Sequence, residues 1–335
     1  MKRFVYIVLV SFLLLSCKKE KGTIYPGNSG LGFQDVCYAA NSTDQFIKTF
    51  KNIVTYSIVG PTLYFPKGRY YRPCFNPENI NEIAYMLVSA SPSVATGLYK
   101  FNFCTGAKTL ITTDIGSDFD WGPNGWIVFS NSSLQLYKIK DNGDSLTKLS
   151  KLGGSNFDSK WSPDGSRLFY INNTIRIMDK NGNNEIIIPA NPFKAIDWID
   201  NNTLLVFKGG INKFCKFNIS ENAISNPICS YTTTYTDPKI FDRKNNLCYQ
   251  SLNNGPGAKD YFIKYDFNNN SLDTMQTQFD SYFYGTGDYN PATNKTIIQL
   301  IRQEWKDSIK AEINYFMEPL IINPNGTKER LLKID

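Results

Sequence analysis

A short pattern that recurs six times along the chain restricts the fold more than any other feature. Each copy has an aromatic residue, then a turn rich in Pro, Asn, Asp or Gly, then a short apolar strand. In the clearest copy, WSPDGSRLFY at 161–170, Pro163 suits the second position of a β-turn, Asp164 the third and Gly165 the exit. The aromatic heads of the six copies are Phe75, Trp121, Trp161, Trp198, Phe241 and Tyr289. We therefore expect a fold built from one repeated β-unit.

The spacing and content of the copies predict an all-β fold, the β-propeller. The heads are roughly 40 to 50 residues apart, and further strand-like segments follow and precede each of them. We expect six blades of four antiparallel strands. Within each of the short apolar strands the apolar residues are nearly continuous and do not alternate with polar ones, as in sheets buried on both faces. Each aromatic head should pack between neighbouring blades. A seventh blade within residues 51–66 is the alternative.

The copies at 161 and 121, WSPDGSRLFY and WGPNGWIVFS, resemble the repeat of TolB-like propellers. The resemblance covers about residues 65–335 and implies a structural role for the turn residues Pro163, Asp164 and Gly165. The copies at 198, 241 and 289 depart further from the repeat. We assign residues 67–335 to the propeller domain and residues 42–66 to an N-terminal cap segment with one short helix over 44–50.

The start of the chain is typical of a bacterial lipoprotein. Lys2 and Arg3 precede an apolar run over 4–15, which is too short for a membrane span. The run ends in Leu-Leu-Ser-Cys, which resembles a lipobox and implies a signal peptide over 1–16 and lipidation of Cys17. By the same resemblance Lys18 implies the outer membrane, and the charges after it resemble surface-export signals of Bacteroidetes lipoproteins. The anchored protein would face the periplasm or the cell surface, on a flexible tether over 17–41.

Charge and cysteine content narrow the set of partners. Loss of Lys2 and Arg3 with the leader lowers the formal net charge from +6 to +4. The chain has no dense block of Lys and Arg that would bind nucleic acid.

Six cysteines follow Cys17. In an oxidising compartment Cys215–Cys229 is the preferred disulfide, on neighbouring strands of one hairpin. Free buried thiols are the alternative. No CxxC spacing supports a thiolate metal site. We expect no metal and no cofactor.

Catalysis has little support in the sequence. The chain has no histidine, which excludes Ser-His-Asp and Cys-His catalysis and histidine-ligated metals. Two carboxylates would still suffice to cleave a glycoside. Two runs with spaced oxygen ligands do not fit a calcium loop and are interpreted as turns. They contain Asp114, Asp118 and Asp120, and Asp179, Asn181 and Asn183.

The predicted binding face carries the variable loops. In a four-stranded blade, the connections between the second and third strands and between blades share one face, and here they vary widely in length. On this face we expect residues suited to a protein or a glycan. They are Arg69, Tyr70, Tyr71, Tyr231, Tyr235, Tyr282, Phe283, Tyr284 and Trp305. A position in the core between blades is the alternative for each aromatic residue.

The sequence therefore predicts a monomeric envelope lipoprotein, anchored in the membrane by its lipid alone, whose propeller is a non-catalytic module that binds another envelope protein. The alternative is a propeller that binds or cleaves glycans on the outer membrane. A cluster of two or more inward acids about 5 to 10 Å apart in an aromatic-lined pocket would favour the enzyme, and a broad, flat aromatic face without such a pair would favour protein binding.

Overall fold

The computed structural model is all β, and most of its strands pair with the next strand along the chain. It describes residues 54–57, 69–79, 81–89, 91–102, 105–151, 153–188, 193–208, 213–225, 227, 229–230, 240–252, 261–276, 281–290, 295–307, 312–322 and 328–331. These residues form 26 strands and one short 3-10 helix, η1 (Pro123–Gly125). No helix among them is long and apolar enough to span a membrane. The leader, Cys17, the tether and the predicted helix over 44–50 lie outside the described residues.

The first three sheets are antiparallel and keep the order of the chain. Sheet 1 contains β2 (Arg69–Phe75), β3 (Glu82–Val88), β4 (Gly97–Asn102) and β5 (Lys108–Thr112). Sheet 2 contains β6 (Phe119–Trp121), β7 (Trp126–Ser130), β8 (Leu136–Lys140) and β9 (Thr147–Lys148). Sheet 3 contains β10 (Phe157–Trp161), β11 (Arg167–Asn172), β12 (Thr174–Asp179) and β13 (Ile186–Ile188).

The other three sheets follow the same plan, with one added strand in two of them. Sheet 4 contains β14 (Phe193–Asp200), β15 (Thr203–Lys208), β16 (Lys213–Asn218) and β17 (Ala223–Ile224), with β18 (Cys229–Ser230) also paired to β16. Sheet 5 contains β19 (Ile240–Asp242), β20 (Leu247–Leu252), β21 (Tyr261–Asp266) and β22 (Ser271–Gln276). Sheet 6 contains β23 (Ser281–Asn290), β24 (Lys295–Asp307), β25 (Glu312–Ile322) and β26 (Lys328–Leu331).

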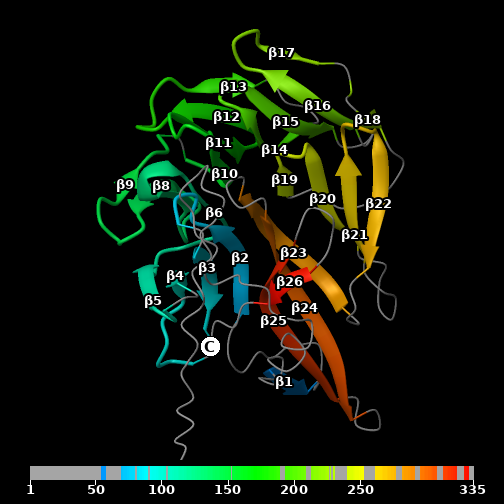
Figure 1. Cartoon of the computed structure of the whole chain (residues 1–335). Coiled ribbons are helices and arrows are strands. Elements are labelled where there is room, and N and C mark those ends of the chain that lie inside the picture. The colour runs from blue at the N-terminus through cyan, green and yellow to red at the C-terminus, as the bar shows by residue number, and fades with distance from the viewer. Residues whose placement is uncertain are drawn as a thin grey trace, which may run out of the picture.

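The sheets surround a common centre (Figure 1). Their first strands, β2, β6, β10, β14, β19 and β23, lie innermost, and the later strands of each sheet lie further out. A hydrogen bond from the backbone N–H of Phe75 in β2 to the carboxylate of Asp288 in β23 connects the first sheet to the last. The fold is therefore a β-propeller with antiparallel blades of four strands, which confirms the fold class that the repeat predicts.

Sheet 6 takes up a strand from the other end of the described chain. β1 (Val54–Ser57) pairs with one half of β25, and β26 pairs with the other half. The described part of segment 51–66, where a seventh blade was the alternative, thus joins sheet 6 and does not form a sheet of its own. The predicted binding face counts residues 279–289 and 302–312 among its variable loops. This is wrong for 281–289 and 302–307, because these residues belong to the long strands β23 and β24.

Buried aromatic heads lie between neighbouring sheets. Trp121 clusters with side chains of sheets 1 and 2, Trp161 with sheets 2 and 3, Trp198 with sheets 3 and 4, and Phe241 with sheets 4 and 5. The ring centroids of Trp198 and Phe169 are 6.0 Å apart across one such boundary. Since each large ring removes much apolar surface from water, these positions hold consecutive sheets face to face.

The turn after Trp161 explains why its sequence is so regular. Asp164 accepts hydrogen bonds from the hydroxyl groups of Ser162 and Ser166, at 2.7 and 2.9 Å. Gly165 has φ of +67°, a left-handed conformation that residues with a Cβ adopt at a cost. These residues therefore shape the reversal from β10 to β11.

The expected disulfide between Cys215 and Cys229 is absent. Cys215 is a buried free thiol, and the residue opposite Cys229 in the pairing of β16 with β18 is Phe214. Successive residues of a strand face opposite sides of a sheet, so the two cysteine positions are out of step by one residue. Burial raises the pKa of the Cys215 thiol, which favours the unreactive protonated form.

Candidate functional site

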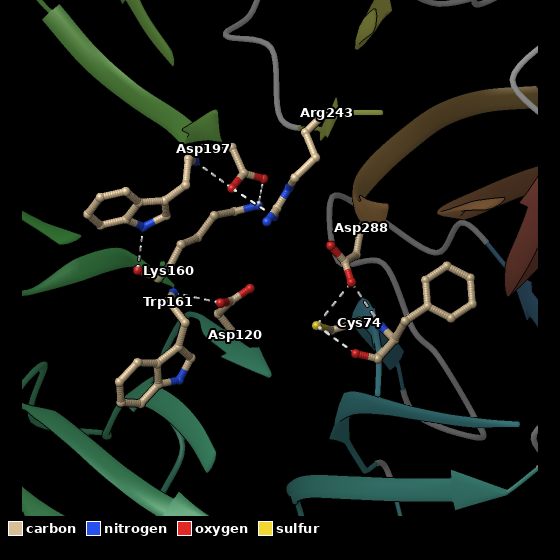
Figure 2. Close-up of polar contacts among 9 residues, drawn as sticks. Cys74, Asp120, Lys160, Trp161, Asp197, Arg243 and Asp288 are labelled. Atoms are coloured by element: carbon tan, nitrogen blue, oxygen red, sulfur yellow. Dashed lines mark hydrogen bonds and ion pairs between the residues drawn. The ribbon is translucent and has the colours of Figure 1, made fainter. Parts of the chain in front are cut away.

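One polar cluster lies where the six innermost strands come together (Figure 2). Its members are Cys74, Asp120, Lys160, Asp197, Arg243 and Asp288, here called the axial cluster. Five of them are the residue directly before an aromatic head. In the remaining innermost strand, β19 of sheet 5, the residue before the aromatic head is Ile240. Arg243, from the turn after β19, belongs to the cluster instead. The repeat thus brings one position from successive blades to the centre.

Lys160, Asp197 and Arg243 form the ion-paired half of the axial cluster. Lys160 Nζ lies 2.8 Å from Asp197 Oδ2, and Arg243 Nη2 lies 3.6 Å from Asp197 Oδ1. Burial opposes the charge of Lys160, but the nearby carboxylates, Asp197 first, outweigh it and raise the pKa of the ammonium group. The charge of Asp197 is therefore compensated by two cations, one from sheet 3 and one from sheet 5.

Asp120 and Asp288 form the acidic half and accept hydrogen bonds across sheet boundaries. Asp120 Oδ2 accepts the backbone N–H of Trp161 at 2.8 Å. Asp288 Oδ2 accepts the backbone N–H of Phe75 at 3.0 Å and the thiol of Cys74 at 3.3 Å. In both cases an acid before one aromatic head accepts the N–H of the head of the next sheet. No described residue donates to either Oδ1, and Figure 2 shows these oxygens beside the open space of the cluster.

Burial favours the protonated forms in this half of the cluster. It raises the pKa of Asp120 to about 7, where Lys160 opposes the shift and Asp288 and Asp197 add to it. Burial also raises the pKa of Asp288, against the effect of Lys160. The Cys74 thiol is buried beside two acids, and both effects raise its pKa well above the usual range. Cys74 is therefore a protonated thiol at neutral pH and a poor nucleophile.

The members of the axial cluster other than Cys74 line a cavity of about 230 Å³. Every one of the six sheets contributes to its wall, so the cavity lies on the axis of the ring. Its lining includes Pro77, Pro123 and Pro163 from the turns after three innermost strands, together with Trp121 and Trp161. Within the described part of the chain, no group of three or more Cys, Asp or Glu is arranged to hold a metal ion.

This axial cavity opens on the face opposite to the predicted binding face. The predicted binding face is formed by the connections between second and third strands and between blades. The cavity is bounded by turns between first and second strands. Among the predicted residues, Arg69, Tyr70 and Tyr71 lie in β2, Tyr282, Phe283 and Tyr284 in β23, and Trp305 in β24, while Tyr231 and Tyr235 lie outside the described residues. Their gathering on one face stays a prediction.

Sequence reasoning did not find the axial cluster, although a signal was present. An Asp directly precedes the aromatic head in three of the six copies, at 120, 197 and 288. A repeated carboxylate inside a buried strand has no role in packing and indicates a polar function. The interpretation of Asp120 as a turn residue is wrong, because it lies in β6 and lines the axial cavity.

The other acids of the two calcium-like runs maintain local structure. Asp114 accepts hydrogen bonds from the backbone and hydroxyl groups of Ser132. Asp118 accepts the backbone N–H of Ser159 at 2.9 Å and so joins sheet 2 to sheet 3. Asp179 accepts two backbone N–H groups of its own hairpin turn. Each carboxylate therefore has partners within the protein.

Comparison with known proteins shows likeness in the fold. No family model and no curated protein matches the chain. A protein assigned as TolB from Agrobacterium tumefaciens is similar at 13% identity and a TM-score of 0.50, over 69% of this chain and 87% of that one. The acylaminoacyl peptidase of Pyrococcus horikoshii is similar at 12% identity and a TM-score of 0.52, over 80% of this chain and 46% of that one.

The GH74 enzyme of Niastella koreensis is similar at 15% identity and a TM-score of 0.47, over 70% of this chain and 44% of that one. This chain thus spans less than half the length of the Pyrococcus and Niastella enzymes. The fold and the axial cluster define a β-propeller with a polar axial cavity. Its structural neighbours include TolB-like propellers.

Proposed function

We propose that the protein is a non-catalytic binding propeller whose axial cavity accepts one cationic side chain, Lys or Arg, of a partner protein. The size of the cavity carries this proposal. At about 230 Å³ it is smaller than the roughly 300–1,000 Å³ of pockets that enclose whole small molecules. A cavity of this size suits a single side chain, with the rest of the partner on the face around the mouth.

The charges of the axial cluster favour a cation. Asp197 is already paired with two cations, whereas Asp120 and Asp288 each keep one oxygen without a donor among the described residues. An ammonium or guanidinium group would donate to these oxygens and offset the repulsion between the carboxylates. Since a bound cation stabilises the ionised form, it would lower the pKa of Asp120 from about 7, and binding would release a proton.

The cellular setting is part of the same proposal. The leader and Cys17 support a protein that its lipid anchors to the outer membrane, on the periplasmic or the cell-surface side. We propose that it acts there as a monomer. The six described sheets support a closed ring of six blades. The partner would be another envelope protein, and binding would need no cofactor.

Glycan binding or cleavage is the second candidate, and one observation favours it. The axial cavity combines several inward carboxyl groups with aromatic walls, as glycoside hydrolysis requires. Asp120, with a pKa of about 7, would be the proton donor, and Asp197 would be the second carboxylate. Against this role, Asp120 uses one oxygen between sheets and Asp197 is held by two cations.

A pair of small probes tests the proposal on the full chain in detergent. N-acetyl-lysine methylamide is titrated and compared with N-acetyl-norleucine methylamide, which keeps the four side-chain carbons of lysine and lacks the ammonium group. We expect saturable binding of the lysine probe only, and weaker binding as pH falls from about 8 to about 6, because protonated Asp120 no longer attracts a cation. Asp120→Asn combined with Asp288→Asn should weaken binding about tenfold or more.

The control variant is Asp144→Asn, which removes an exposed carboxylate of sheet 2 and should leave binding unchanged. Equal binding of both probes, or unchanged binding in the double variant, rejects the cation site.

A panel of plant and bacterial polysaccharides tests the second candidate, glycan cleavage. Release of reducing ends by the wild type, lost in Asp120→Asn, would establish a glycoside hydrolase in place of the binding module.

A further inference from the structure

A second cavity, of about 260 Å³, lies between sheets 2 and 3. We call it the inter-blade cavity. Its lining comes from η1 and β8 on one side and from the turn 162–166 and Lys180 on the other. Pro123 and Trp161 line both this cavity and the axial one, so the two cavities share part of their walls. The function proposed above makes no use of this second cavity.

The inter-blade cavity holds a buried cation without an ionic partner. Lys138, in β8, is only 7% exposed, and its Nζ donates to the backbone oxygen of Lys180 at 2.6 Å. The same Nζ lies 4.6 Å from the centroid of the Trp126 ring. No described carboxylate lies within ion-pair distance of Lys138. Burial and the charge of Lys180 lower its pKa, although Asp179 opposes them, so the ammonium charge is incompletely compensated.

Positive charge dominates around this cation. The Lys140 ammonium lies 4.4 Å from the centroid of the same Trp126 ring, and Lys180 belongs to the lining. Asp164 is the carboxylate of the lining, and its oxygens accept hydrogen bonds from the hydroxyl groups of Ser162 and Ser166. An anion that enters the cavity would therefore meet a buried ammonium group that lacks a counter-ion, in a setting where charge pairs are strong.

A buried hydrogen-bond donor points to the same kind of ligand. Trp161 is 5% exposed, and its indole N–H has no hydrogen-bond partner. The equivalent indole N–H of Trp198 donates to the backbone oxygen of Lys160 at 3.1 Å. Buried donors without an acceptor are rare in folded proteins. Because Trp161 lines both cavities, its side chain brings an unpaired donor close to the space that a ligand would occupy.

We propose that the inter-blade cavity binds a carboxylate, supplied by an acidic side chain of the partner protein. The carboxylate would accept a hydrogen bond from the Lys138 ammonium, which lies over the Trp126 ring. This inference rests on the proposed function for the identity of the partner. The shared wall of Pro123 and Trp161 would let one extended segment place a basic side chain in the axial cavity and an acidic one beside it.

The experiment follows the tryptophan indole N–H signals in NMR spectra of the 15N-labelled full chain in detergent. The probe is N-acetyl-aspartic acid methylamide, and N-acetyl-asparagine methylamide is its neutral counterpart. We expect a saturable shift of the Trp161 signal with the aspartyl probe only. The Trp198 signal should stay in place, because its N–H already has an acceptor. Lys138→Met should weaken the response about tenfold or more, and Lys138→Arg should keep it.

Lys148→Met is the matched control, because Lys148 is an exposed lysine of β9 in the same sheet. Equal responses to the two probes, or a full response in Lys138→Met, would overturn the carboxylate site. An equal response to inorganic phosphate would overturn its restriction to an acidic side chain. The lysine probe separates the two proposals: if it fails while the aspartyl probe binds, the axial site is wrong and the anion site stands. The reverse outcome rejects the anion site alone.

Discussion

In two blades, the carboxylate directly before the aromatic head both joins neighbouring sheets and lines the axial cavity. β2 and β10 are the innermost edges of their sheets, so some of their N–H groups have no strand partner. Asp288 and Asp120 supply acceptors for two of these groups, at 3.0 and 2.8 Å, and leave their other oxygens at the cavity. A structural bond and a ligand-binding atom thus belong to the same side chain.

Asp288→Ala should destabilise the protein through the N–H of Phe75, which would lose its acceptor. We expect the free energy of unfolding to fall by about 1–3 kcal/mol, the usual cost of a buried donor left unsatisfied. Asp288→Asn keeps an acceptor oxygen and should lose much less. Urea unfolding followed by tryptophan fluorescence measures both variants. Equal decreases in the free energy of unfolding for the two variants would show that the charge of Asp288, and not its hydrogen bond, stabilises the propeller.

Asp120 should make the stability of the protein depend on pH. Its pKa is about 7 in the folded state and near 4 in the unfolded chain, so the folded state holds more protons between these values. The free energy of unfolding should therefore fall as pH rises from about 4 to about 7. Asp120→Asn, which keeps an acceptor for Trp161, should flatten this slope. Urea unfolding at several pH values checks it, and an unchanged slope would assign the dependence to other groups.

At the scale of the element, the turn after β6 sets how closely two blades approach. A Cβ built on Gly122 would lie 2.4 Å from the Trp161 ring, closer than atoms can pack. That ring is 5% exposed and lies in the core between sheets 2 and 3, so it has little room to move. The glycine is therefore required by the space between blades.

Gly122→Ala should lower the free energy of unfolding by about 1–3 kcal/mol, because the methyl group forces sheets 2 and 3 apart. Gly153→Ala is the control, since a Cβ there meets no atom within 4 Å. Thermal unfolding should separate the two variants clearly. A stable Gly122→Ala would mean that the Trp161 ring shifts, and the Trp161 indole signal would then move as well.

At the scale of the whole molecule, closure of the ring depends on contacts between distant parts of the chain. Asp288 of sheet 6 bonds to Phe75 of sheet 1, and β1 pairs with β25 in the register Val54↔Tyr315. Both contacts join the ends of the described chain. Blades that are held on both sides should unfold together, as one cooperative unit.

Deletion of residues 54–57 should weaken this closure. Without β1, residues 312–315 of β25 keep their pairing with β24 but lose the partner on their other side and present an open edge. We expect a melting temperature lower by several degrees, at about 2–4 °C for each kcal/mol lost, and more aggregation on heating. A deletion of equal length at 28–31, in the expected tether, should leave the melting temperature unchanged. If the two deletions behave alike, β1 has no part in closure.

From the sequence alone, the repeat determined the fold class, the approximate blade boundaries and the positions that pack between blades. These features follow from local chemistry: Trp161 and Gly165 mark a turn, and the recurrence of that turn implies one structural unit after another. The same local reasoning failed for the pair Cys215–Cys229, because the register of a short edge strand does not follow from hairpin proximity.

Only the tertiary structure decided where the candidate site lies. Asp120, Lys160 and Asp288 are separated by many residues in the chain, and each looks like an isolated polar residue beside a core aromatic. The propeller geometry brings them to one axis, where burial raises the pKa of Asp120, Asp288 adds to the shift and Lys160 opposes it. The same geometry leaves carboxylate oxygens of Asp120 and Asp288 without a donor among the described residues. Their chemistry depends on neighbours from other blades, and local sequence carries no information about those distances.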